Sequence, residues 1–169
     1  RHICVSEDVA AHARKRTRLD PAKVRVIPNG VDTLRFEGVT PLDLSRYGIV
    51  DDARVVLCLG RLDLQKDPLG AVEVFEQVAD AHPDVQLVFA GDGPLRETLV
   101  ERIGRSRRAA RMHVLGWVAD VPALLSRMEV LLLASRWEGM PNVVLESLAS
   151  GRPCVTRPVQ GVAELVLHG

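Results

Sequence analysis

The sequence lacks the features that mark a membrane-spanning, disulfide-rich or nucleic-acid-binding protein. Its longest apolar runs, near 55–59 and 130–134, are too short to span a bilayer. Cysteine occurs three times, as Cys4, Cys58 and Cys154, with no C-x-x-C spacing, so we expect reduced thiols and a cytoplasmic protein. Lysine plus arginine and aspartate plus glutamate are equal at 22 each, so no net charge indicates a nucleic acid partner.

Histidine is also sparse, and none of the five histidines has the spacing of a metal site, so no metal is predicted. The opening stretch, RHICVSEDVA, has neither an initiator methionine nor the apolar core of a signal peptide. We therefore expect a piece of a longer protein. With 169 residues, of which 47% are apolar, the chain suits one domain, or one domain and part of another.

The sequence does contain a regular alternation of short apolar runs with helical patterns. Strands are predicted at 24–28, 54–60, 85–90, 112–115, 129–134 and 152–156, and helices at 68–81, 94–104, 121–127 and 141–150. Several strands are continuously apolar, as is typical of strands covered on both faces. This order predicts an α/β protein with a doubly wound, parallel, Rossmann-like sheet whose strands end at one ligand-binding edge.

Two of the helices carry more detailed predictions. The helix at 68–81 is expected to bury an apolar stripe made of Ala71, Val74, Phe75, Val78 and Ala79. The helix at 121–127 follows Asp120, an expected N-cap residue, and has Pro122 in its first turn.

The chain divides into three parts by pattern. Residues 1–20 look like a strand end and a basic helix, the tail of a preceding N-terminal domain. Residues 21–53 have no sustained period over most of their length and are interpreted as an interdomain segment and linker. Residues 54–169 hold the Rossmann-like domain.

One candidate site follows the strand at 54–60, in the stretch GRLDLQKD. Gly60 allows a sharp turn, and Arg61 and Lys66 then stand at the carboxyl edge of the sheet. An arginine fork and a lysine charge there can bind a diphosphate. The alternative is that both are solvated loop cations. The stretch is not a P-loop, because the second glycine and the GK[ST] ending are missing.

Two further loops end strands at the same edge. GDGPLRE, 91–97, lacks the third glycine of a dinucleotide fingerprint, so a plain strand-to-helix turn is the favoured interpretation. SRWEGMPNVVLES, 135–147, places Glu138 before a helix start and Glu146 within the helix. A helix start attracts anions, and carboxylates accept hydrogen bonds from sugar hydroxyls. The alternative is that both glutamates are solvated.

Taken together, these stretches resemble the E-x7-E glycosyltransferases of group 1, usually called family 4, which are retaining enzymes with the GT-B fold. The resemblance covers nearly the whole chain and keeps the family order. It rests on IPNGVD (27–32), GRLDLQKD (60–67), FAGDGPLRE (89–97), VLGWVAD (114–120), EGMPNVVLESLASGRPCV (138–155) and GVAELV (161–166). One departure is Gln160-Gly161, where the family often has Gly-Gly.

The resemblance implies a role for each matching residue. Arg61 and Lys66 would bind the donor diphosphate, Glu146 the ribose, and Glu138 the transferred sugar, with Glu138, Arg61 and Lys66 as the catalytic group. The remaining implied donor contacts are Gly60, Gly116, Trp117, Val118, Gly139, Met140, Pro141 and Asn142. No metal or cofactor is implied, and no Asp-x-Asp occurs in the sequence. A UDP-sugar is favoured as donor over a GDP- or ADP-sugar.

The resemblance also implies what surrounds this chain. The full-length enzyme would transfer a hexosyl group, with retention, to a glycan or lipid-linked acceptor held by a missing N-terminal domain. The chain would also stop before the family's last helices. We therefore expect residues 54–169 to be a truncated nucleotide-sugar-binding domain that transfers nothing alone. Two alternatives remain: a non-catalytic nucleotide-sugar-binding module, and a nucleotide-sugar epimerase or a phosphorylase on the same scaffold.

Two basic clusters and two tryptophans are left over. The clusters, 14–18 and 102–111, are either solvated helix faces or contacts to anionic lipid at the inner face of the membrane. Trp117 and Trp137 flank the proposed site, and we expect them to pack in the core or at its rim rather than to stack on sugar.

Overall fold

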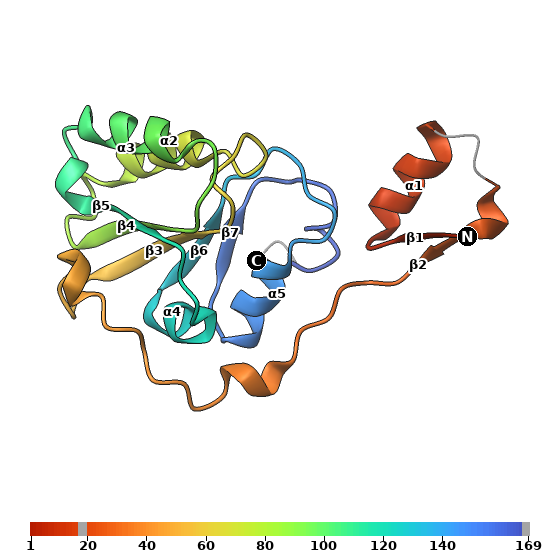
Figure 1. Ribbon diagram of the computed structural model, residues 1–169, viewed down its shortest axis with the longest axis horizontal. Coiled ribbons are helices and arrows are strands. Elements are labelled where there is room, and N and C mark those ends of the chain that lie inside the picture. The colour runs from red at the N-terminus through yellow and green to blue at the C-terminus, as the bar shows by residue number, and fades with distance from the viewer. Residues whose placement is uncertain (17–19, 167–169) are drawn as a thin grey trace.

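The computed structural model describes residues 1–16 and 20–166 and contains two parallel sheets (Figure 1). The strands are β1 His2–Cys4, β2 Val24–Val26, β3 Arg54–Leu59, β4 Val85–Ala90, β5 Met112–Gly116, β6 Val130–Leu133 and β7 Cys154–Thr156. The α-helices are α1 Glu7–Arg16, α2 Pro68–Val78, α3 Arg96–Gly104, α4 Val121–Arg127 and α5 Asn142–Ala149. No helix in the described part of the chain is long and apolar enough to cross a membrane.

The main sheet has the strand order β5-β4-β3-β6-β7, and all its pairings are parallel. The predicted α/β class and parallel Rossmann-like sheet are therefore confirmed. The chain moves outward from β3 through β4 to β5, then returns to the other side of β3 with β6. The switch point of this doubly wound sheet thus lies between β3 and β6, where ligands bind in such folds.

Helices cover both faces of the main sheet: α2 and α3 on one, α4 and α5 on the other (Figure 1). Phe75, Phe89 and Leu99 are fully buried under the first pair. The predicted stripe of α2 is partly wrong, because Val74 and Val78 are 38% and 43% exposed. They lie on the flank of the helix, while Ala71, Val72, Phe75 and Ala79 face the sheet.

The irregular segment between the two sheets packs firmly against the main sheet near its end. Leu44 and Ile49 are each 1% exposed and belong to the core beneath α4 and α5. The Leu42 amide donates to the Ala123 carbonyl of α4, with N and O 2.9 Å apart. The second half of the predicted linker is therefore part of the main core.

The first residues form a separate β1-α1-β2 unit, seen beside the main sheet in Figure 1. His2–Cys4 pair in parallel with Val24–Val26, and Cys4, Ala10 and Val24 make a small core under α1. The strand predicted at 24–28 is observed at Val24–Val26, within the stretch interpreted as an interdomain segment. The composition of a short strand does not show which strand it pairs with.

Candidate functional site

The loops after β3 and β6 meet at the switch point of the sheet through an ion pair. Lys66 Nζ lies 2.7 Å from Glu138 Oε1. The Glu138 side chain is only 6% exposed and that of Lys66 23%. The Ser135 hydroxyl donates to the same carboxylate at 2.6 Å, and the Gln65 amide donates to its other oxygen at 3.4 Å. The pair carries no net charge, so the ammonium group offsets the repulsion between the carboxylate and an anion that approaches Lys66.

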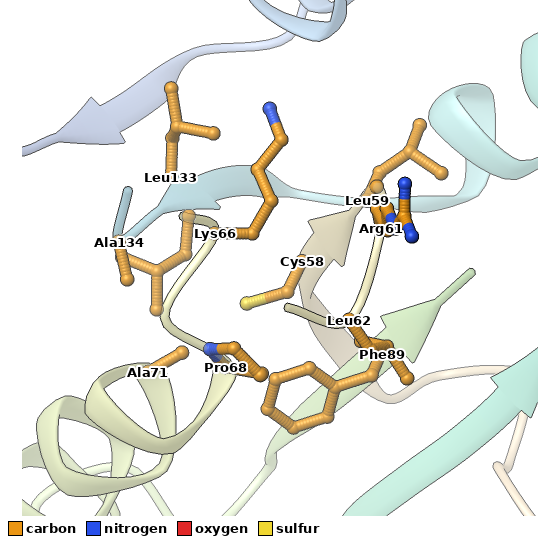
Figure 2. A pocket seen from close by; sticks show the side chains of 12 residues that line it. Cys58, Leu59, Arg61, Leu62, Lys66, Pro68, Ala71, Phe89, Leu133 and Ala134 are labelled. Carbon is orange, nitrogen blue, oxygen red and sulfur yellow. The ribbon is translucent and has the colours of Figure 1, made fainter. Parts of the chain in front are cut away.

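Lys66 is one of the residues that line a small pocket at the end of β3, together with Cys58 and Arg61 (Figure 2). Its ammonium group is directed away from Phe89 and Pro68. Glycine is favoured at position 60 because φ is +143°, which strains any residue with a Cβ; a Cβ there would also lie 3.3 Å from Lys66 Cε. Burial raises the pKa of the Cys58 thiol to about 12.

Arg61 and Glu146 are the remaining predicted side chains for the diphosphate and the ribose. The Arg61 side chain is 71% exposed, and its Nε lies 3.6 Å from Asp63 Oδ2. Glu146 lies on the second turn of α5 and is half-buried. Burial raises the pKa of its carboxyl, and Arg35 in the segment before β3 partly offsets that effect.

The start of α5 has an exposed first residue, Asn142, while Met140 and Pro141 before it are buried. Pro141 occupies the N-cap position, so the helix begins one residue later than predicted, and it makes no side-chain capping hydrogen bond. Asn29 holds the preceding loop: its side-chain amide donates to the Met140 carbonyl at 3.0 Å and to Asn142 Oδ1 at 2.8 Å. The interdomain stretch at 27–32 therefore contacts the predicted donor loop directly.

Gly139 lies where three parts of the chain come together. A Cβ on Gly161 would lie 1.8 Å from the Gly139 carbonyl oxygen, so only glycine allows this approach. Val5 of the N-terminal unit packs against Gly139. Asp8, on α1, accepts a hydrogen bond from the Gly161 amide at 3.2 Å. The site thus lies where the N-terminal unit meets the main sheet.

Gly116 to Val118, the predicted base loop, lie at the end of β5, on the opposite side of the switch point from α5. The Gly116 carbonyl accepts a hydrogen bond from the Gly91 amide at 2.7 Å, which joins the ends of β4 and β5. Val118 packs against the core cluster that includes residues of α5. The expectation that both indoles pack in the core or at its rim is wrong for Trp117, which is 81% exposed; Trp137 is 49% exposed. Both indoles lie at the surface of the loops that carry them.

Most arginines of the second basic cluster, 102–111, form ion pairs or hydrogen bonds within the chain. Arg102 pairs with Glu76, Arg105 with Glu101, and Arg108 with Asp80. Arg111 donates to the Ala79 and His82 carbonyls and lies over the Phe75 ring. Most of these arginines are therefore paired within the fold rather than only solvated as the first interpretation had it, and these contacts also disfavour lipid contact. In the first cluster, 14–18, residues 17 and 18 lie outside the described residues.

Sequence reasoning missed the residues that support the site: Asn29, Gln65, Asp67 and Ser135. Asp67 had a usable signal, since an aspartate before proline is a common helix start. The others had none, because each contacts a loop distant in sequence. Among the described residues, no group of three or more His, Cys, Asp or Glu side chains could hold a metal ion.

Comparison with known proteins matches both parts of the chain to families. Residues 53–169 match the model described as "Glycosyl transferases group 1", and residues 1–35 match "Glycosyltransferase Family 4". The chain is 34% identical over 167 residues to an Escherichia coli UDP-Gal:alpha-D-GlcNAc-diphosphoundecaprenol alpha-1,3-galactosyltransferase, covering 95% of this chain and 43% of that enzyme. It thus spans less than half the length of this relative.

Solved structures show the same fold. Anabaena Alr3699/HepE, crystallised with UDP and glucose, matches with a TM-score of 0.83 at 24% identity over 99% of this chain and 47% of its own. WaaG, a glycosyltransferase involved in lipopolysaccharide biosynthesis, matches with a TM-score of 0.79 at 22% identity, over 96% and 45%. In both, this fold makes up about half of the protein.

Proposed function

Because the chain belongs to the group 1 glycosyltransferases, we propose that it is the donor-binding part of a retaining enzyme that transfers a hexosyl group from a nucleotide sugar. The observation that carries this proposal is the Lys66–Glu138 pair at the switch point of the sheet. It combines a cation for phosphate with a carboxylate for hydroxyls in one place.

The sheet edge is long enough for the donor contacts that the family resemblance implies. Neighbouring strands are about 4.8 Å apart, so the ends of β5 and β6 are separated by roughly 14 Å along the sheet edge. A nucleoside diphosphate sugar spans such a distance. The base would lie near Gly116–Val118, the diphosphate near Arg61 and Lys66, the ribose at Glu146, and the sugar at Glu138.

On the donor side, the reaction depends on stabilising the diphosphate as its bond to the sugar breaks, while the acceptor hydroxyl forms the new bond and gives up its proton. One proton of the Lys66 ammonium is used by Glu138, and the other two can bind phosphate oxygens. Arg61, exposed beside it, adds a second positive charge, and the uncapped amides at the start of α5 add a third source of attraction. These groups do the work of a metal ion, so we propose metal-independent transfer with a UDP-sugar as donor.

The acceptor and the location are proposed for the full-length enzyme. The acceptor would be a glycan or lipid-linked sugar bound by a missing N-terminal domain, and the enzyme would work in the cytoplasm at the inner face of the membrane. Arg14, Lys15 and Arg16 support lipid contact, because all three are exposed. Flotation with anionic vesicles should show binding at low salt and loss at raised salt; no binding at low salt would end this idea.

A titration of the chain with UDP, GDP, ADP and their sugars, with and without EDTA, tests the donor site. We expect EDTA-insensitive binding of UDP compounds that Lys66→Ala and Glu146→Gln weaken. Arg105→Ala, which removes an exposed cation of α3, is the matched control and should bind normally. Equal binding by all three variants would place the site elsewhere, and the non-catalytic alternative gains if the full-length protein binds donor without turnover.

A further inference from the structure

Asp67, the residue after Lys66, has a conformation unlike its neighbours. It is the one non-glycine residue with positive φ (+49°) within 1–16 and 20–166, and it caps the start of α2 by accepting from the Gly70 amide at 3.3 Å. Its side chain is 9% exposed. A buried carboxylate in a left-handed conformation persists only where its surroundings hold it.

Two arginines from other loops hold this carboxylate. Arg157, after β7, lies 2.7 Å from Oδ2, and Arg136, before Trp137, lies 3.2 Å from Oδ1. Burial opposes the charge on Asp67, but the hydrogen bonds from the two arginines outweigh it and lower the pKa of the carboxyl. One ionised side chain therefore joins the loops that follow β3, β6 and β7.

Gly70 shows that the chain makes room for this cluster. A Cβ at residue 70 would lie 2.7 Å from Asp67 Oδ2 and 2.9 Å from Arg157 Nη2. Any larger residue would push the carboxylate and the guanidinium apart. The absence of a side chain at this helical position has a packing reason.

The cluster lies directly beside the Lys66–Glu138 pair and is bonded to the same two loops. The Arg136 amide donates to the Gln65 carbonyl at 2.8 Å, and the Gln65 side chain donates to the Trp137 carbonyl at 3.1 Å. Lys66 and Glu138 thus occupy the middle of a stretch that is fixed on both sides. With both arginines, the cluster also adds net positive charge near the diphosphate site.

We propose that Asp67 is a positioning residue for the donor: with Arg136 and Arg157 it clamps three loops so that Lys66 and Glu138 meet the donor in a fixed geometry. This inference rests on the proposed function for its ligand. In this proposal Asp67 contacts no reacting atom of the donor and acts through Lys66 and Glu138 alone.

The test compares Asp67→Asn with Glu76→Gln, which also removes an arginine-paired carboxylate on α2 but lies away from the site. Asparagine tolerates the left-handed conformation and can still cap Gly70, so folding should survive. We expect Asp67→Asn to weaken UDP-glucose binding about tenfold, in the range for partners that orient binding groups. Hydrogen exchange at the Arg136 amide should quicken, and Glu76→Gln should change neither.

A Lys66→Ala background separates positioning from a general effect on folding. The part of the Asp67 effect that acts through Lys66 is absent in this background, so adding Asp67→Asn there should weaken binding by clearly less than the roughly tenfold expected in the unmodified chain, because effects of coupled residues do not add. Normal binding by Asp67→Asn, or a full additional loss in the Lys66→Ala background, would overturn the proposal. If the unmodified chain binds no UDP-sugar, the proposed function fails. If Asp67→Asn still speeds hydrogen exchange at the Arg136 amide in that case, the role of Asp67 in holding the three loops together stands.

Discussion

At the scale of single residues, the Lys66–Glu138 pair makes binding and stability depend on each other. Lys66→Ala leaves the 6%-exposed Glu138 carboxylate without its cation. We expect the free energy of unfolding to fall by about 2 kcal/mol, because an uncompensated buried charge is costly. Urea denaturation measures this change.

The double variant Lys66→Ala/Glu138→Gln serves as the control for charge. It removes both charges and keeps the Ser135 and Gln65 contacts available to an amide, so it should regain stability but not donor binding. Unchanged stability of Lys66→Ala would mean that water or another group compensates Glu138, against the burial described above.

Glu146 should show the opposite balance between stability and binding. Burial raises the pKa of its carboxyl, so the folded protein holds this proton more tightly than the unfolded chain. Its contribution to stability is present at low pH and is lost as pH rises through the raised pKa. At pH 7 we expect Glu146→Gln to raise the free energy of unfolding by at most about 0.5 kcal/mol, since the group stays partly solvated.

Thermal unfolding of Glu146→Gln and the unmodified chain from pH 4 to 8 measures this effect. The difference between the two should grow with pH, while UDP binding by the variant should be weaker throughout. A difference that shrinks with pH would show that the ionised carboxylate is stabilised, not penalised, by the fold.

The residue scale is also where sequence reasoning reached least far. The position of Lys66 and Glu138 at one sheet edge was predictable, because loops after parallel strands share that edge. Their pairing with each other was not, because it depends on β3 and β6 being neighbours. The exposure of Trp117 was unpredictable for a similar reason: nothing in VLGWVAD shows which side of its loop meets the core.

At the scale of elements, the loops of the site fit together through glycine. Gly161→Ala would place a Cβ 1.8 Å from the Gly139 carbonyl oxygen at φ +74°. Gly48→Ala has nearly the same φ, +77°, but nothing within 4 Å. The Gly48 variant should therefore lose about 1 kcal/mol from conformation alone, and the Gly161 variant at least about 2 kcal/mol more from the clash.

Chemical denaturation of both variants gives the comparison. If Gly161→Ala and Gly48→Ala lose the same stability, the turn at 161 can move away from Gly139 freely. The close approach of Gly161, in the turn after β7, to Gly139 would then not be fixed by packing.

Element existence was largely readable from pattern, because the β3, β4 and β6 runs and the helices between them are strongly periodic or apolar. The capping of α4 by Asp120 is confirmed, with its carboxylate 3.0 Å from the Ala123 amide. Which strands pair with one another was harder to predict from the sequence. The strand at 24–26 has the same composition as a main-sheet strand, and only its pairing with β1 separates it.

At the scale of the whole molecule, the chain joins the proposed donor edge to a small unit that carries Val5 and Asp8 to the same site. We expect the chain to bind a UDP-sugar and to transfer nothing, because we propose that a further domain binds the acceptor. Radiolabelled transfer to water or to a lipid-linked acceptor measures this. Turnover by residues 1–169 alone would contradict the division of labour between two domains.

Cys58 offers a chemical reporter of the proposed donor site. Its thiol lines the same small pocket as Arg61 and Lys66, and burial raises its pKa to about 12, so the thiolate needed for alkylation is rare. Alkylation of Cys58 should therefore be slow in the unliganded chain, and a donor bound at Lys66 should slow it further.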